Sequence, residues 1–184
     1  MQAFKDYLHS FVSGIPYEIY LMVLIICVGT VILWRVYGSK RSCRCLSSLL
    51  LAEYVFLLYC STVFFREARV DRKCDFTPFW SYRAIEQGQI QLLPENFMNV
   101  IAFLPIGLLI GVGSANCSWW KVLGLGCLIS ISIETMQYIF KCGFSEVDDV
   151  MHNTLGCAIG FGIAKLMMII YSAIVGHNKC AKYR

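Results

Sequence analysis

Five long apolar stretches constrain the fold of this chain more than any other feature. An α-helix needs about 20 mostly apolar residues, with a range of about 17–25, to cross the roughly 30 Å hydrocarbon core of a bilayer. All five stretches meet this requirement, the third only narrowly. The membrane spans are expected at about residues 17–36, 46–65, 97–113, 119–140 and 153–175.

The composition excludes an ordinary soluble domain. Of the 184 residues, 58% are hydrophobic and only 15% are charged, whereas soluble domains carry about 25% charged residues. A water-soluble fold of this size has too little interior to bury so much apolar surface. The sequence therefore predicts an all-α, polytopic transmembrane helical bundle of about five helices, forming a single domain over residues 1–184.

Basic residues predict the orientation of the chain. The end of the first stretch and the loop after it carry four basic residues and no acid, namely Arg35, Lys40, Arg41 and Arg44, and the C-terminal tail carries three and no acid. Because cytoplasmic segments are enriched in Lys and Arg, we expect the N-terminus outside and the C-terminus in the cytoplasm. The second loop, residues 66–96, counts against this orientation because it holds five basic residues, although five acids accompany them.

The net charge and the cysteine spacing argue against nucleic acid and metal as partners. A net charge of +4, spread over short groups beside apolar runs, does not indicate a nucleic-acid-binding protein. The ten cysteines have irregular spacing, and Cys43-x-Cys45 lacks the second ligand pair of a zinc site. We therefore expect no metal and no cofactor, and the lipid bilayer is the one partner that the composition predicts.

The fourth stretch carries a polar stripe. Ser130, Glu134, Gln137 and Lys141 are separated by offsets of four, seven and eleven from the first, so they share one helical face. At 1.5 Å per residue, Glu134 lies ~9 Å inside the helix end. Ionisable groups inside a span are costly and usually face the bundle interior. A structural hydrogen bond between helices and a functional site are both open interpretations of Glu134 and Gln137.

The start of the fifth stretch is also polar. Asp148 and Asp149 lie where the macrodipole of a following helix favours negative charge, so capping alone is one explanation of them. Asp149 and Asn153 share a face with Gly156 and Gly160, and this Gly-x-x-x-Gly spacing lets a neighbouring helix approach closely.

On this topology, polar side chains from four segments converge at one membrane face. Asparagines open the third span, and two arginines follow the second; helix capping and headgroup anchoring are the simpler roles for them. The convergence nevertheless predicts a ligand-binding cluster of Arg66, Arg69, Asn99, Glu134, Gln137, Asp148, Asp149 and Asn153.

Four motifs resemble those of VanZ-like membrane proteins. Residues 99–107 match Asn-x-x-x-Phe-x-Pro-x-Gly, Glu134 and Gln137 match Glu-x-x-Gln, and residues 148–156 match Asp-Asp-x-x-x-Asn-x-x-Gly. Residues 75–79 resemble an Asn-Leu-x-Pro-Phe segment, with Asp75 in place of the usual Asn. The resemblance covers about residues 66–160 in the family's order. It implies a multi-pass protein of the bacterial cell membrane, in a family founded on an accessory protein for resistance to the glycopeptide teicoplanin.

Three functions fit these residues. The first is binding of an envelope lipid or a lipidated glycopeptide at the outer leaflet, with Arg66 and Arg69 donating charge-assisted hydrogen bonds to phosphate. The second is an enzyme acting on a lipid-linked precursor, with Glu134 or Asp149 as general acid or base. The third is a structural membrane subunit. The binding and enzyme hypotheses both predict that Glu134 and Asp149 share a cavity with Asn99.

Overall fold

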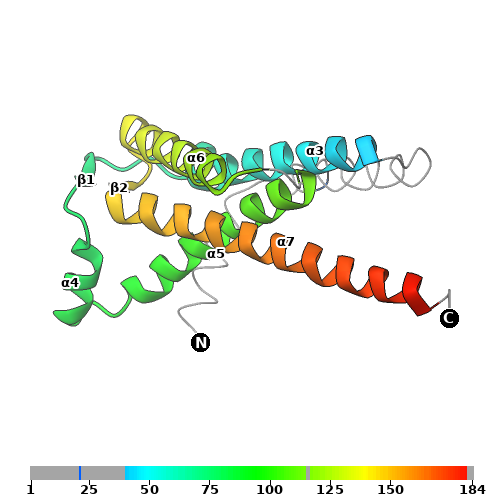
Figure 1. Ribbon diagram of the computed structural model, residues 1–184. Coiled ribbons are helices and arrows are strands. Elements are labelled where there is room, and N and C mark those ends of the chain that lie inside the picture. The colour runs from blue at the N-terminus through cyan, green and yellow to red at the C-terminus, as the bar shows by residue number, and fades with distance from the viewer. Residues whose placement is uncertain (1–20, 22–39, 115–116, 182–184) are drawn as a thin grey trace.

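The computed structural model describes residue 21 and residues 40–114 and 117–181 (Figure 1). The expected first span, residues 17–36, lies outside the described residues apart from Leu21. The described elements are, in order, α3 (Lys40–Tyr59), the π-helix η1 (Cys60–Phe64), β1 (Lys73–Asp75), α4 (Trp80–Glu86), α5 (Leu92–Gly113), α6 (Trp119–Phe140), β2 (Phe144–Glu146) and α7 (Val147–Ala181).

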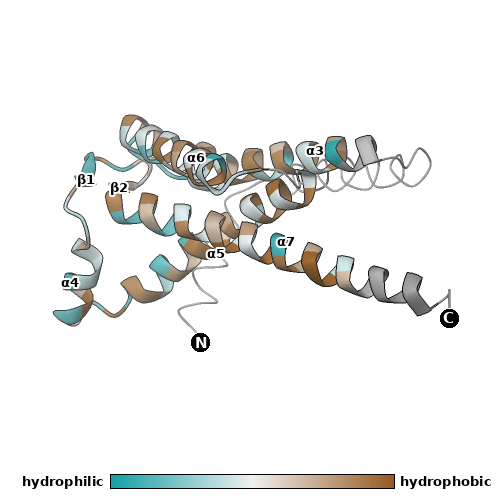
Figure 2. Cartoon of the chain, in the orientation of Figure 1, coloured by the Kyte–Doolittle hydropathy of each residue, from teal (hydrophilic) through white to brown (hydrophobic). Residues whose placement is uncertain are grey.

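Four of the described helical segments are long and apolar enough to cross a membrane. They are Arg44–Phe64, Leu92–Gly113, Trp119–Phe140 and Val147–Ala173. Figure 2 shows hydrophobic residues along these helices, while hydrophilic residues gather at the end that holds α4 and β1. The protein is therefore an all-α, polytopic helical bundle, as the apolar stretches predict.

Two helices begin earlier than expected. α5 begins at Leu92 rather than near residue 97, because Pro94 is tolerated in the first turn, where backbone N–H groups have no partner within the helix. α7 begins at Val147 rather than near residue 153, so that Asp148 and Asp149 lie in its first turn. Both aspartates are therefore helical residues, and their side chains leave α7 in different directions.

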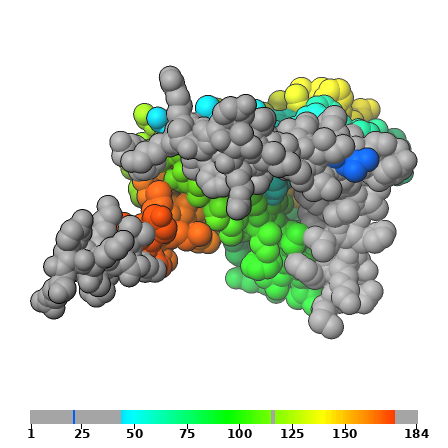
Figure 3. Space-filling model, turned by 90° about the vertical axis from the view of Figure 1, so that its right-hand side faces the viewer, coloured from blue at the N-terminus to red at the C-terminus, as the bar shows by residue number. Residues whose placement is uncertain are grey.

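α5 and α7 pack together at backbone distance. A Cβ atom on Gly156 would lie 2.1 Å from the carbonyl oxygen of Val100, and one on Gly160 would lie 1.9 Å from that of Leu104. Glycines at such positions let two helices approach without side chains between them. In Figure 3 the orange residues of α7 accordingly lie beside the green residues of α5, and Phe161 is completely buried.

A two-stranded parallel sheet closes one end of the bundle. β1 pairs with β2 in the register Lys73 with Phe144, Cys74 with Ser145 and Asp75 with Glu146. This pairing ties the loop after η1 to the loop between α6 and α7, and α4 lies at the same end of the molecule (Figure 1). The apolar periodicity does not predict these strands, because three residues are too few to show an alternating pattern.

Candidate functional site

Asp148 holds the start of α4 in place. Its side chain is 1% exposed. It accepts hydrogen bonds from the backbone N–H of Phe79 at 2.6 Å, the backbone N–H of Ser81 at 2.9 Å and the hydroxyl of Ser81 at 2.6 Å. Phe79 has a φ of 63°, a left-handed conformation that is uncommon for a bulky residue. Asp148 therefore caps a helix, but that helix is α4, whose first residues precede it by nearly seventy positions.

The asparagines of α5 bind two neighbouring helices. Asn96 donates to the hydroxyl of Ser81 at 3.1 Å, and Asn99 donates to Oδ1 of Asp149 at 2.6 Å. The first bond links α5 to α4, and the second links α5 to α7. Amides that are paired in this way fasten helices together, because an unpaired polar group in an apolar interior is costly.

The polar stripe of α6 faces the interior. Ser130, Glu134 and Gln137 are all buried. Oε2 of Glu134 accepts a hydrogen bond from the backbone N–H of Glu146 at 3.0 Å. Gln137 donates to the carbonyl oxygen of Thr62 at 3.3 Å. The helical spacing therefore correctly predicts which face of α6 is buried.

Asn153 completes the contacts of this stripe. Its amide donates to the hydroxyl of Ser130 at 2.9 Å, in a bond between two buried side chains of α7 and α6. Together with the glutamine bond to η1, this contact connects α6 to two of its neighbours. Asn153 and Gln137 therefore act as bridges between helices.

Arg66 and Arg69 are both exposed, beyond the end of η1. The backbone N–H of Arg69 donates to the carbonyl oxygen of Lys141 at 2.7 Å. The positive charge of Arg66 attracts the carboxylates of Glu134 and Asp149, and these two carboxylates repel each other. The guanidinium therefore offsets part of the negative charge that is buried at this end of the bundle.

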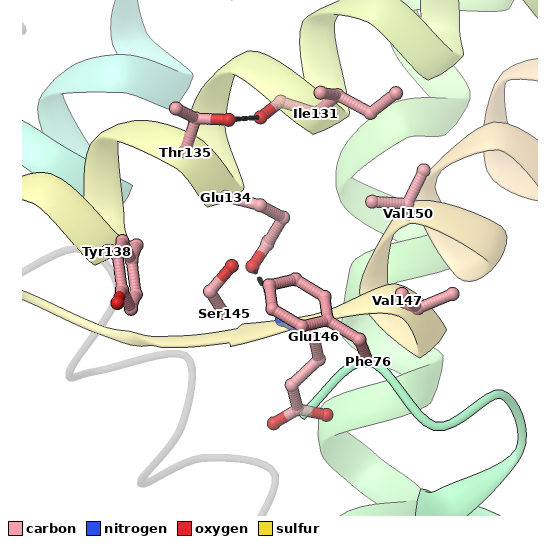
Figure 4. A pocket seen from close by; sticks show the side chains of 9 residues that line it. All are labelled: Phe76, Ile131, Glu134, Thr135, Tyr138, Ser145, Glu146, Val147 and Val150. Atoms are coloured by element: carbon pink, nitrogen blue, oxygen red, sulfur yellow. Dashed lines mark hydrogen bonds between the residues drawn. The ribbon is translucent and has the colours of Figure 1, made fainter. Parts of the chain in front are cut away.

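A pocket of ≈ 330 Å³ opens between α6, β2 and the start of α7 (Figure 4). Its walls are mostly apolar, and Glu134 points into it from α6. The lining residues are Phe76, Ile131, Glu134, Thr135, Tyr138, Ser145, Glu146, Val147 and Val150.

This pocket is lined by only one of the three residues that were expected to share a cavity. Glu134 lines the pocket, but Asp149 and Asn99 do not; they bond to each other between α5 and α7. The reason is helical geometry. Successive residues on a helix point about 100° apart, so α7 presents Val147 and Val150 to the pocket while Asp149 turns toward α5.

Glu146 is a site residue that the sequence reasoning missed. It lines the pocket, and its Oε2 accepts a hydrogen bond from Nε1 of Trp80 at 2.8 Å. Burial raises the pKa of Glu146 to about 8, the negative charge of Asp149 adds to this effect, and the bond from Trp80 opposes it. Its position two residues before Asp148 was the one available signal, because three acids within four residues are unusual in so apolar a chain.

The described residues hold no group of three or more His, Cys, Asp or Glu side chains placed to bind a metal ion. The site is instead an apolar pocket with two carboxylates at the edge of a helical bundle. The fold and this site define a multi-pass α-helical membrane protein with a polar end that encloses a small pocket.

Comparison with known proteins identifies the family. The VanZ/LLP1 family model matches residues 49–169, and the chain belongs to that family, as its four motifs predict. Protein VanZ from Enterococcus faecium is 33% identical to the chain over 66 residues, which are 36% of this chain and 41% of that protein. The matched region thus spans about two-fifths of that relative's length. No solved structure matches the chain.

Proposed function

We propose that this protein binds an envelope lipid or a lipidated glycopeptide in the pocket between α6, β2 and α7. The observation that carries the proposal is the pocket itself, which combines apolar walls with the buried carboxylate of Glu134. Small-molecule sites are typically mostly apolar concavities of about 300–1,000 Å³ with a few polar groups that fix the ligand's orientation. An acyl chain matches the walls, and a polar head matches the carboxylate.

The proposal places this pocket at the outer leaflet of a bacterial cell membrane, with the N-terminus outside and the C-terminus in the cytoplasm. The basic C-terminal tail supports that orientation. A contribution to glycopeptide resistance belongs to the same proposal, because a lipidated glycopeptide carries the acyl chain that such a pocket accommodates. Its support is the motif resemblance and the shared family.

Ligand binding to the purified full chain in nanodiscs tests the proposal, with bacterial envelope lipids and teicoplanin as probes. Val150→Phe fills the pocket with a larger side chain, and we expect it to weaken binding at least tenfold. Val112→Phe makes the same change at the other end of α5, where the side chain is exposed, and should alter affinity less than twofold. Equal affinities of the two variants for every probe would disprove the proposal.

A membrane-embedded enzyme is the second candidate, and Glu146 is the observation that favours it. A carboxyl group with a pKa of about 8 exchanges its proton near neutral pH, as a general acid or base must. Turnover of a lipid-linked precursor by the purified protein, lost in Glu146→Gln, would support this reading. Binding without turnover in either protein would leave the binding function alone.

A further inference from the structure

Two buried polar side chains of the pocket have unused hydrogen-bonding capacity. Glu134 is 6% exposed, and its one hydrogen bond among the described residues uses Oε2, which leaves Oε1 without a partner there. Ser145 is 4% exposed, and its hydroxyl has no hydrogen-bond partner within the described part of the chain. Figure 4 shows the Glu134 side chain pointing toward Ser145 at the centre of the lining residues. A bound group that donates hydrogen bonds would satisfy both.

The pocket wall is acidic. Its lining includes the carboxylates of Glu134 and Glu146 and no Lys, Arg or His among the described residues. Neither Arg66 nor Arg69 belongs to the lining. Arg72 stands 5.6 Å from the ring centroid of Tyr138 and does not itself line the pocket. An anionic head placed here would therefore meet two acidic groups and no cation, and it would oppose their ionisation, whereas a cationic head favours the ionised form of both carboxyl groups.

From this geometry we infer that the pocket selects an amphiphile with a primary ammonium head over one with a phosphate head. The inference rests on the proposed binding function and names its ligand class. An ammonium group offers three hydrogen-bond donors and no acceptor, which suits Oε1 of Glu134 and the hydroxyl of Ser145. Its bond to a carboxylate is charge-assisted and stronger than a neutral one. The alkyl chain lies against the apolar side chains of Phe76, Ile131 and Val150.

Three probes of equal chain length test this ligand class: dodecylamine, 1-dodecanol and dodecyl phosphate. Their binding to the full chain in phosphatidylcholine nanodiscs is measured by titration calorimetry, with protein-free nanodiscs as the blank. We expect dodecylamine to bind at least tenfold more tightly than dodecyl phosphate, with dodecanol between them. This comparison needs no variant, so it holds even if a substitution impairs folding.

Matched variants then assign the preference to the pocket. Glu134→Gln keeps the shape and an acceptor oxygen but removes the charge, and should lower dodecylamine affinity at least fivefold. Glu86→Gln makes the same change at an exposed position outside the pocket lining and should leave the affinity unchanged.

The outcomes separate this inference from the proposed function. If Val150→Phe weakens the binding of all probes but dodecyl phosphate binds the native protein as tightly as dodecylamine, the ligand class is wrong and the binding function stands. An unchanged dodecylamine affinity in Glu134→Gln also overturns the ligand class. If Val150→Phe changes the binding of no probe, the proposed function itself fails.

Discussion

At the scale of single residues, four acidic side chains at the polar end of the bundle have two different roles. Asp148 and Asp149 are occupied by neighbours in α4 and α5, so they hold the polar end of the bundle together. Glu134 and Glu146 instead reach a pocket. The four carboxyl groups lie within a short stretch of two helices and one strand, yet their roles follow from the direction in which each side chain points.

Asp148→Asn tests whether Asp148 holds the polar end of the bundle together. The substitution leaves one acceptor oxygen for three donors and brings an NH₂ group toward backbone N–H groups. Because hydrogen bonds to a buried charged group are worth about 1.5–3 kcal/mol each, we expect the free energy of unfolding to fall by about 2–3 kcal/mol. Unfolding in mixed detergent micelles measures it. Asp75→Asn, which affects an exposed bond to the N–H of Thr77, is the control and should cost less than about 0.5 kcal/mol; equal losses would contradict the capping role.

Glu146 predicts a pH dependence of stability. Its pKa of about 8 in the folded protein lies above its ordinary value of 4.5, so the folded state retains a proton that the unfolded state releases. Stability should therefore fall as the pH rises from about 4.5 to about 8. Thermal midpoints of the native protein and Glu146→Gln across this range measure the effect, and the fall should be shallower in the variant. Parallel curves would show that Glu146 does not cause the pH dependence of stability.

At the scale of elements, the contact between α5 and α7 is the central joint of the described bundle. Small residues bring the two backbones together over several turns, with Gly107 on α5 facing Cys157 and Gly156 on α7 facing Val100. This joint positions Asn99 beside Asp149 and sets the direction in which Val150 faces the pocket. The shape of the site therefore depends on glycines that do not line it.

Gly156→Ala tests this joint. The added methyl group would lie 2.1 Å from a carbonyl oxygen, which forces the helices apart, and overpacking of this kind costs about 1–3 kcal/mol. Gly124→Ala is the matched control, because nothing lies within 4 Å of its added Cβ. The control should stabilise α6 by about 0.5–1 kcal/mol, the usual advantage of Ala over Gly in a helix. Unfolding in mixed micelles should change in opposite directions for the two variants; a tolerated Gly156→Ala would contradict the close contact.

At the scale of the whole molecule, the polar elements gather at one end of a bundle that is otherwise apolar outside. α4, β1 and β2 form a cover over that end (Figure 1). Ser81 and Tyr82 of α4 bind it to α7 through residues that are 67 and 70 positions away along the chain. The exposed apolar residues of the helices match the lipid around them. Because the polar elements lie at one end, the orientation of the chain decides which side of the membrane the pocket faces.

Labelling with a membrane-impermeant maleimide tests that orientation. Cys74 in β1 and Cys45 near the start of α3 are both exposed. β1 and the start of α3 lie at opposite ends of the described bundle (Figure 1). With the N-terminus outside, Cys74 should react in intact bacterial cells, and Cys45 only after the membrane is permeabilised. Cys74→Ser and Cys45→Ser identify each labelled site by its loss. The reverse pattern would invert the orientation and place the pocket at the cytoplasmic face.

The positions of helices and the buried face of α6 could be predicted because hydropathy and the 3.6-residue period are local properties of the chain. Glu134, Gln137 and Ser130 are examples, since each is buried where the spacing places it. The motifs around Asn99 and Asp148 likewise indicate the family without any knowledge of the contacts that they make. A bilayer strengthens such predictions, because it requires each span to satisfy its own backbone hydrogen bonds.

The pocket and the separate roles of the acidic residues could be recognised only in the folded chain. Glu146 becomes a site residue because β2 pairs with β1 and Trp80 reaches it, and Asp149 leaves the site because α7 turns it toward Asn99. These outcomes depend on contacts between residues far apart in sequence and on the rotation of one helix against another. No local sequence pattern encodes these long-range contacts or the rotation of a helix, because both result from the packing of all the elements together.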